Sequence, residues 1–167
     1  AIANVAAEVH DCIFKYGGAY GGALYVTGVS PAVSGNTFIS NVTGIELDDS
    51  SSALTNNTVT GSTEWPVELH DNSFPTYSGN SYSGNAISGI RIWGNITANG
   101  RWNREILPFY LSSLGVTIQA TSTVQVPARS IFKLNGDSTD IWCYGDLEME
   151  STAAEPIYFT SWKDDEV

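Results

Sequence analysis

The chain has 167 residues, of which 42% are hydrophobic and 15% charged, and its formal net charge at pH 7 is −11. This length predicts a single domain with a substantial core, and the apolar content excludes a disordered chain. The acidic balance argues against nucleic acid and anionic membrane surfaces as partners, and no apolar run of about 18 residues predicts a membrane span.

Residues 1–31 are expected to form an opening coil of a repetitive fold. Residues 1–7 lack the basic start and long apolar core of a signal peptide, so the chain looks mature or cut from something longer. Residues 16–22 read Tyr-Gly-Gly-Ala-Tyr-Gly-Gly, which predicts a flexible turn. Cys12 and Cys143 lie in different halves of the chain, so we expect two buried thiols rather than a disulfide.

A six-residue phrase then recurs three times, as VSGNTF, LTNNTV and YSGNSY, beginning at Val33, Leu54 and Tyr77. The asparagine at its fourth position lies 21 and then 23 residues further on at each return. Self-similarity at such a period is typical of stacked-repeat architectures. We expect these asparagines, Asn36, Asn57 and Asn80, to stack as a file at a bend of the backbone.

A second phrase keeps step with the first and begins at residues 23, 44, 66 and 89. Apolar residues alternate in it with Tyr25, Glu46, Glu68 and Arg91, so one face is expected to point inward and the other outward. Each run has about four residues and no helical segment separates the runs, which favours short strands. Short strands recurring at about 22 residues predict a parallel β-helix.

Residues 96–112 break the pattern and are expected to form either a lid on the first stack or a connecting seam into the next. Residues 113–167 restart the repeat. A spacing of 23 residues predicts that Ile118 stacks with Ile141, Ala120 with Cys143, and Leu134 with Ile157. The prediction is thus an all-β solenoid of about seven coils with a repeat of 21–24 residues, built from coils in 1–95, a seam in 96–112 and coils in 113–167.

The phrases SPAVSGNTFISNVTGIELDDSS and HDCIFKYGGAYGGALYV in residues 1–95 resemble the right-handed parallel β-helix repeats of the broad CASH-type group. Residues 108–165 are similar to the segment that begins such a β-helix in secreted, multi-repeat surface proteins of prokaryotes. The resemblance implies a right-handed β-helix and an extracellular or cell-surface location. It also implies either a window from a longer tandem array or a unit whose end continues into another chain. It implies little about activity, because many unrelated functions share this scaffold.

The outward face of the second phrase is the best candidate site. Glu46, Glu68 and Arg91 are expected in one file about 4.8 Å apart, and the favoured interpretation is a solvated ladder of charges. If the chain holds a metal, calcium is the expected ion, bound by Asp49, Asp71 and Glu46.

The same face carries an enzyme alternative, which we disfavour because the Gly-His-Gly phrase of pectin hydrolases is missing. A calcium-dependent polysaccharide lyase would use Arg91 as its base, and a glycosidase would pair Glu46 or Glu68 with Asp48. His10 and His70 belong to no recognisable metal cluster or nucleophile triad.

Three further sets of residues are candidates for recognition. Glycosylation sequons occur at Asn41, Asn56 and Asn95, although Asn/Thr-rich bends produce this motif by composition. Outward aromatic residues expected to stack on sugars are Tyr25, Trp93 and Trp142, whereas Trp65 precedes Pro66 in a bend. Interface residues expected at the two ends are Ile2, Val5, Ile157, Phe159 and Trp162.

The ends suggest the function, because an uncapped β-helix exposes unpaired strand edges that favour end-to-end self-association. The sequence therefore predicts an extracellular structural protein, a cell-surface scaffold, adhesin or head-to-tail filament subunit. A carbohydrate-binding module is the first alternative, with glycans as ligands, and the lyase or glycosidase is the second.

Overall fold

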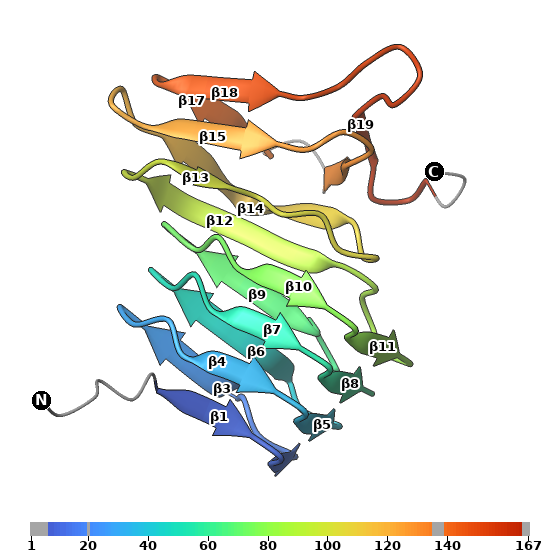
Figure 1. Cartoon of the computed structure of the whole chain (residues 1–167). Helices are drawn as coiled ribbons and strands as arrows, with labels where there is room; N and C mark the ends of the chain where they lie inside the picture. Colours follow the sequence, from blue (N-terminus) through green and yellow to red (C-terminus); the bar gives the residue numbers. More distant parts are fainter. Residues whose placement is uncertain (1–6, 20, 135–138, 165–167) are drawn as a thin grey trace, which may run out of the picture.

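A computed structural model describes residues 7–19, 21–134 and 139–164, together forming a solenoid of parallel strands (Figure 1). These residues contain nineteen strands and no helix, and hence no helix long and apolar enough to cross a membrane. The solenoid has about six turns, close to the seven expected. The predicted all-β parallel fold is confirmed.

Four sheets run along the stack, and every strand pair is parallel. Sheet A contains β1 (Glu8–His10), β4 (Ala32–Ser34), β7 (Ala53–Thr55) and β10 (Thr76–Ser78). Sheet B contains β2 (Ile13–Lys15), β5 (Thr37–Ile39), β8 (Thr58–Thr60) and β11 (Ser81–Ser83). Sheet C contains β3 (Gly22–Thr27), β6 (Thr43–Asp48), β9 (Val67–His70), β12 (Ile90–Ile96), β14 (Phe109–Ile118), β16 (Ile131–Leu134), β17 (Ile141–Cys143) and β19 (Tyr158–Ser161). Sheet D contains β13 (Gly100–Arg101), β15 (Thr123–Val126) and β18 (Asp146–Met149).

Sheet C is the only sheet that runs from the first coil to the last in the described residues. Its register builds one inward file through the whole core. In chain order the file contains Leu24, Ile45, Val67, Ile90, Phe109, Phe132 and Phe159. The rings of Phe132 and Phe159 stack with their centroids 4.9 Å apart. Because parallel pairing sets residues of equal register directly above one another, alternation within each phrase separates a core face from an outer face.

The predicted asparagine file forms the bend between sheets A and B. The side-chain amide of Asn36 donates to Asn57 Oδ1 at 3.0 Å, and that of Asn57 donates to Asn80 Oδ1 at 3.2 Å. The Asn57 amide also donates to the Val33 carbonyl, and its Oδ1 accepts from the Asn36 backbone N–H. The ladder thus satisfies backbone groups that the bend removes from the strand ladders.

Residues 96–112 lie inside the stack, where the cross-section changes. Sheet B ends at β11, and sheet D begins with β13. The Trp102 ring, 2% exposed, fills the core beside Phe109 and Phe132. Glu105 is bonded to the side chains of Asn80 and Tyr82, so it terminates the asparagine ladder where sheet B stops.

Several files predicted for residues 113–167 are wrong. Ile118 pairs with Cys143 rather than Ile141, because the paired positions Leu134 and Ile141 are two residues further apart in the sequence than their partners Leu111 and Val116. Leu134 pairs with Ser161 rather than Ile157, because the turn after β18 is four residues longer than the one after β15. The spacing of 23 residues does hold between β14 and β16 and between β15 and β18, as in the pairs Leu111 with Leu134 and Val124 with Leu147.

Both cysteines are free and exposed, so their predicted burial is wrong. Cys12 does occupy the asparagine slot of the first coil, where its N–H donates to Asn36 Oδ1. Cys143 follows the altered register of β17 and packs beside no cysteine. Each lies in a terminal coil, where no described coil covers its outer side.

The ladder predicts a large energetic difference between neighbouring asparagines. Asn57→Ala leaves the Val33 carbonyl and the Asn36 amides without partners, so we expect a loss of about 2–4 kcal/mol in the free energy of unfolding. The matched control is Asn56→Gly, because Asn56 is exposed and has a positive φ of 53° that glycine adopts freely. Urea unfolding measures both variants, and equal midpoints would contradict the ladder.

Glu105, which terminates the asparagine ladder, predicts that the stability of the fold depends on pH. Burial raises the pKa of Glu105 above its usual 4.5, partly opposed by hydrogen bonds from Asn80 and Tyr82. The stability from this group is therefore present below the unfolded pKa and lost as the pH rises through the folded pKa. Glu105→Gln keeps an acceptor without the charge, so its melting temperature should gain on the wild type between about pH 4 and pH 7. A constant difference across that range would show that Glu105 is not the titrating group.

Candidate functional site

The candidate site lies on the outer face of sheet C. Glu46 on β6, Glu68 on β9 and Arg91 on β12 occupy one file of the parallel register. His70 and Trp93 occupy the neighbouring file two residues further along. The second phrase of the repeat therefore brings the predicted charged residues together.

Glu68 is the centre of this network. Its Oε1 accepts hydrogen bonds from Arg91 at 2.8 Å and from the Trp93 indole at 2.8 Å, and lies 3.0 Å from His70 Nε2. The same histidine nitrogen lies 3.4 Å from Glu46 Oε1. The His70 and Trp93 rings pack with centroids 4.0 Å apart. Two carboxyl groups therefore share one imidazole.

The network is buried, so the prediction of a solvated ladder is wrong. Glu46 is 8% exposed and Glu68 6%. The glycine-rich turn lies against Glu46, because the Gly22 N–H donates to Glu46 Oε2 at 2.5 Å. A Cβ on Gly22 would lie 2.6 Å from the Glu46 nitrogen, so glycine alone permits this approach. The composition of the turn was visible in the sequence, but its position over β6 was not.

The two carboxyl groups have opposite pKa shifts. Burial raises the pKa of Glu46, the electrostatic interaction with His70 lowers it, and the charge on Glu68 raises it further. Burial also acts to raise the pKa of Glu68, but hydrogen bonds from His70 and Trp93 and the charge of Arg91 outweigh it, so the pKa falls. A pair of carboxyls with separated pKa values has the form of an acid–base pair.

A hollow of about 290 Å³ adjoins the network. Its lining residues are Gly18, Ala19, Gly21, Val42, Thr43, Glu46, Glu64, Glu68 and Arg91. Since Glu68 Oε1 already has three partners, the geometry favours a network that holds the outer face together. The enzyme alternative, with Glu46, Glu68, Asp48 and Arg91 as its residues, stays a prediction.

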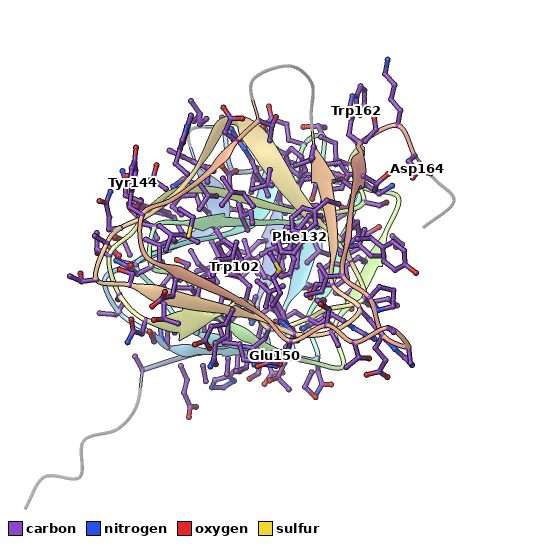
Figure 2. All side chains as sticks on the ribbon, turned by 90° about the horizontal axis from the view of Figure 1, so that it is seen from above. Trp102, Phe132, Tyr144, Glu150, Trp162 and Asp164 are labelled. Atoms are coloured by element: carbon purple, nitrogen blue, oxygen red, sulfur yellow. The ribbon has the colours of Figure 1, made fainter. Side chains whose placement is uncertain are left out.

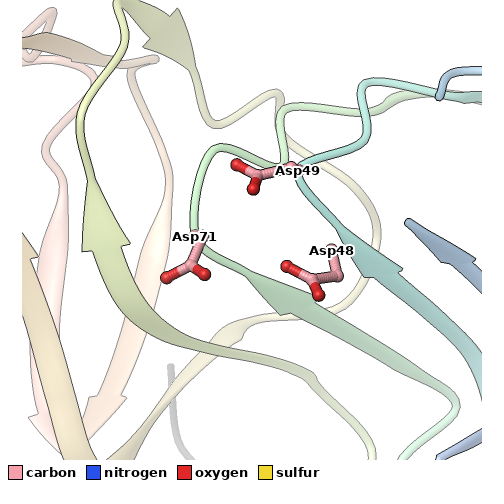
Figure 3. Close-up of side chains that lie close together, drawn as sticks. All are labelled: Asp48, Asp49 and Asp71. Atoms are coloured by element: carbon pink, nitrogen blue, oxygen red, sulfur yellow. The ribbon is translucent and has the colours of Figure 1, made fainter. Parts of the chain in front are cut away.

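Acidic residues at the ends of β6 and β9 gather beside this network: Asp48 is the last residue of β6, Asp49 follows it and Asp71 follows β9. The side chains of Asp48, Asp49 and Asp71 offer oxygens within 4.8 Å of one another (Figure 3). Asp48 therefore takes the place predicted for Glu46, which bonds to Gly22 instead. Internal donors already bind the cluster: the Tyr25 hydroxyl donates to Asp48 at 2.7 Å. Calcium binding here stays a prediction.

The remaining recognition candidates do not form one surface. Tyr25 on β3 is 50% exposed and Trp142 on β17 is 43% exposed, but they lie in the first and last coils. Trp93 between them is packed against His70. Of the predicted end residues, Phe159 and Trp162 are exposed and Ile157 is half-buried, whereas Ile2 and Val5 lie outside the described residues.

The predicted glycosylation site at Asn41 is wrong. Asn41 is 1% exposed, and its side chain accepts from the Gly17 N–H and donates to the Phe14 carbonyl. The folded chain therefore offers no room for a glycan there. Asn56 and Asn95 are exposed, and their glycosylation stays a prediction.

Sequence reasoning missed the groove formed by Trp65, Tyr110 and Trp162. The Trp65 and Tyr110 rings meet edge to face at 5.4 Å. Tyr110 follows Arg91 in the outer file, which the repeat spacing could have shown had the seam been aligned. Trp65 and Trp162 lie in turns, where no periodic signal places them.

A substitution in the buried network distinguishes the two interpretations of the outer face, a solvated ladder of charges and a buried hydrogen-bonded network. Glu68→Ala leaves Arg91, His70 and Trp93 without their shared acceptor, so we expect a loss of about 3–5 kcal/mol in the free energy of unfolding. Glu64→Ala, at a neighbouring exposed glutamate, should change it by less than about 0.5 kcal/mol. Chemical unfolding compares them, and similar small losses would support a solvated ladder instead.

Comparison with known proteins agrees with this geometry. Residues 2–100 match the family model described as the right-handed beta helix region. No match was found among curated proteins or among solved structures. The matched segment covers more than half of the chain and contains the asparagine ladder and the buried network. The chain therefore belongs to the right-handed β-helix family.

Proposed function

We propose that this chain is an extracellular structural unit that stacks end to end, as a cell-surface scaffold, adhesin or filament subunit. The fold in general supports a repeat scaffold or a carbohydrate-related role. The observation that carries the finer proposal is the position of the exposed large hydrophobic side chains. The first coil contributes Ile13, Tyr16, Tyr25 and Val29, and the last contributes Trp142, Tyr144, Met149, Tyr158, Phe159 and Trp162. Elsewhere in the described ranges only Ile106 and Leu114 are exposed.

The strand edges support the same proposal. Among the described strands, β3 pairs only with β6, and β19 pairs only with β16. Phe159 stacks on Phe132 with one face and is 45% exposed. Unpaired edges with exposed apolar side chains are templates for further pairing. In the register of sheet C, Leu24 of a following unit would lie next to Phe159.

The cross-section of the solenoid restricts this contact. The first coil contains a strand of sheet B, namely β2, but the last coil contains none. Identical units therefore match along sheet C and not around the whole circumference. The contact that we propose joins β19 of one unit to β3 of the next, and a head-to-tail contact that does not close gives a filament.

Phe159→Asp should abolish this association, because it places a charge on the exposed edge of the inward file. We expect the wild type to form concentration-dependent assemblies in light scattering and fibres in electron micrographs, and the variant to remain monomeric. Circular dichroism establishes that the variant is folded.

The matched control is Ile106→Asp, since Ile106 is 82% exposed but lies in the seam, away from both ends. This variant should assemble like the wild type. A wild type that is monomeric at high concentration, or an assembly unaffected by Phe159→Asp, would refute the proposed contact.

A further inference from the structure

A cavity lies on the side of the solenoid where sheet B ends. In Figure 1 the row formed by β5, β8 and β11 stops at β11, which is the last strand of sheet B in the described residues. The seam that follows contributes no strand to that sheet, and its Glu105 is bonded to Tyr82 of β11. The cavity, which we call the seam cavity, is lined by residues 104–109 and 129–131 and has a volume of about 220 Å³. It occurs where the seam interrupts the repeat.

The inner wall of the seam cavity is apolar and belongs to the core. Phe109 is 1% exposed, and its ring centroid lies 5.2 Å from that of Phe132 and 6.4 Å from that of Trp102. Viewed down the stack, Phe132 and Trp102 lie in the interior of the solenoid (Figure 2). A cavity of about 150 Å³ with apolar walls is large enough for benzene. The seam cavity therefore has room for one ring or a short branched chain beside Ile106, Leu107, Pro108 and Ile131.

Two exposed arginines line the seam cavity in an otherwise acidic protein. The chain has 7 Lys and Arg residues against 18 Asp and Glu, and two of the seven are Arg104 and Arg129 in this lining. Within the described part of the chain, no acidic side chain pairs with Arg104. Arg129 Nη2 lies 2.8 Å from Glu155 Oε1, but the two side chains are 59% and 46% exposed, so this pair contributes little and leaves other guanidinium donors free. The two arginines therefore favour an anion.

The backbone holds Arg129 in an unusual conformation beside the cavity. Its φ is 63°, in the left-handed region that residues with a Cβ seldom adopt. The Arg129 N–H donates to the Pro156 carbonyl at 3.1 Å, and the Ser130 hydroxyl donates to the Pro127 carbonyl at 2.8 Å. Such backbone conformations concentrate at functional sites. This strain supports a role for Arg129 beyond the exposed ion pair with Glu155.

The acidic residue of the lining, Glu105, already has partners within the protein. It is hydrogen-bonded to the side chains of Asn80 and Tyr82 in the preceding coil and to the backbone of Ile106. A carboxyl group with three donors is satisfied without Arg104 or Arg129. The guanidinium groups therefore need an acceptor from outside the chain.

We propose that the seam cavity binds a small carboxylic acid with an apolar body, such as a single aromatic ring. The body would pack against Phe109, and the carboxylate would accept hydrogen bonds from Arg104 and Arg129, whose planar guanidinium groups match its geometry. A small inorganic anion would leave the apolar wall in contact with water, and a neutral ligand would leave the arginines without an acceptor. The site is independent of the end-to-end contact, because none of the residues assigned to the two ends lines it.

Titration of the full chain with benzoate, benzamide and acetate tests the proposal, with binding followed by amide chemical shifts in NMR spectra. Benzamide keeps the ring without the charge, and acetate keeps the charge without the ring. We expect benzoate to bind with a Kd of about 1 mM or tighter and to shift the amides of residues 104–109 and 129–131. The other two probes should bind at least about tenfold more weakly. Arg104→Gln should weaken benzoate binding about tenfold.

The matched control is Arg101→Gln, which removes the same charge three residues away from a side chain that pairs with Glu150 and does not line the cavity. Its affinity for benzoate should equal that of the wild type, and circular dichroism establishes that both variants are folded. Equal binding of benzamide would refute recognition of the charge, and equal binding of acetate would refute the apolar body. No binding of benzoate, or equal losses in the Arg101 and Arg104 variants, would refute the site.

Discussion

The structure depends on the in-register parallel pairing of sheet C. Each residue of one coil lies above its counterpart in the previous coil, at the strand spacing of about 4.8 Å. Apolar residues gain from this arrangement, as in the file from Leu24 to Phe159. Stacked asparagines are stabilised as well, since each side chain has both a hydrogen-bond donor and an acceptor for its neighbours. Carboxylates at this spacing repel one another, so an acidic file is stable only where positive charges or hydrogen-bond donors lie beside it.

This repulsion between stacked carboxylates explains why the outer face of sheet C carries an ionic network. Register forces Glu46 and Glu68 into adjacent positions. His70 contacts both carboxyls, and Arg91 follows as the next residue of the file. The glycine-rich turn lies against Glu46 and supplies it with the N–H of Gly22, while both carboxyls are buried. Burial and compensation arise together, and they separate the pKa values of two chemically identical groups.

The sequence predicted the strand positions and stacked files that recur in every coil. It did not predict the features that differ from one coil to the next. The recurring asparagines and the alternation around Ile45 and Val67 set strand positions, because a file repeats one environment many times. The sequence distance between successive paired positions changes after β16 and after β18, so a constant spacing misaligned Ile118 and Leu134. Glu105 has no counterpart in other coils, and a residue that occurs once gives no periodic signal.

Assembly along the axis would use one direction of the solenoid and leave its sides free. The proposed end-to-end contact involves the axial edges at β3 and β19. With about six turns in a unit, the repeat would be roughly 30 Å. The outer face of sheet C, with its buried network, would then recur once per unit, because an axial contact covers the ends of the solenoid and not its sides.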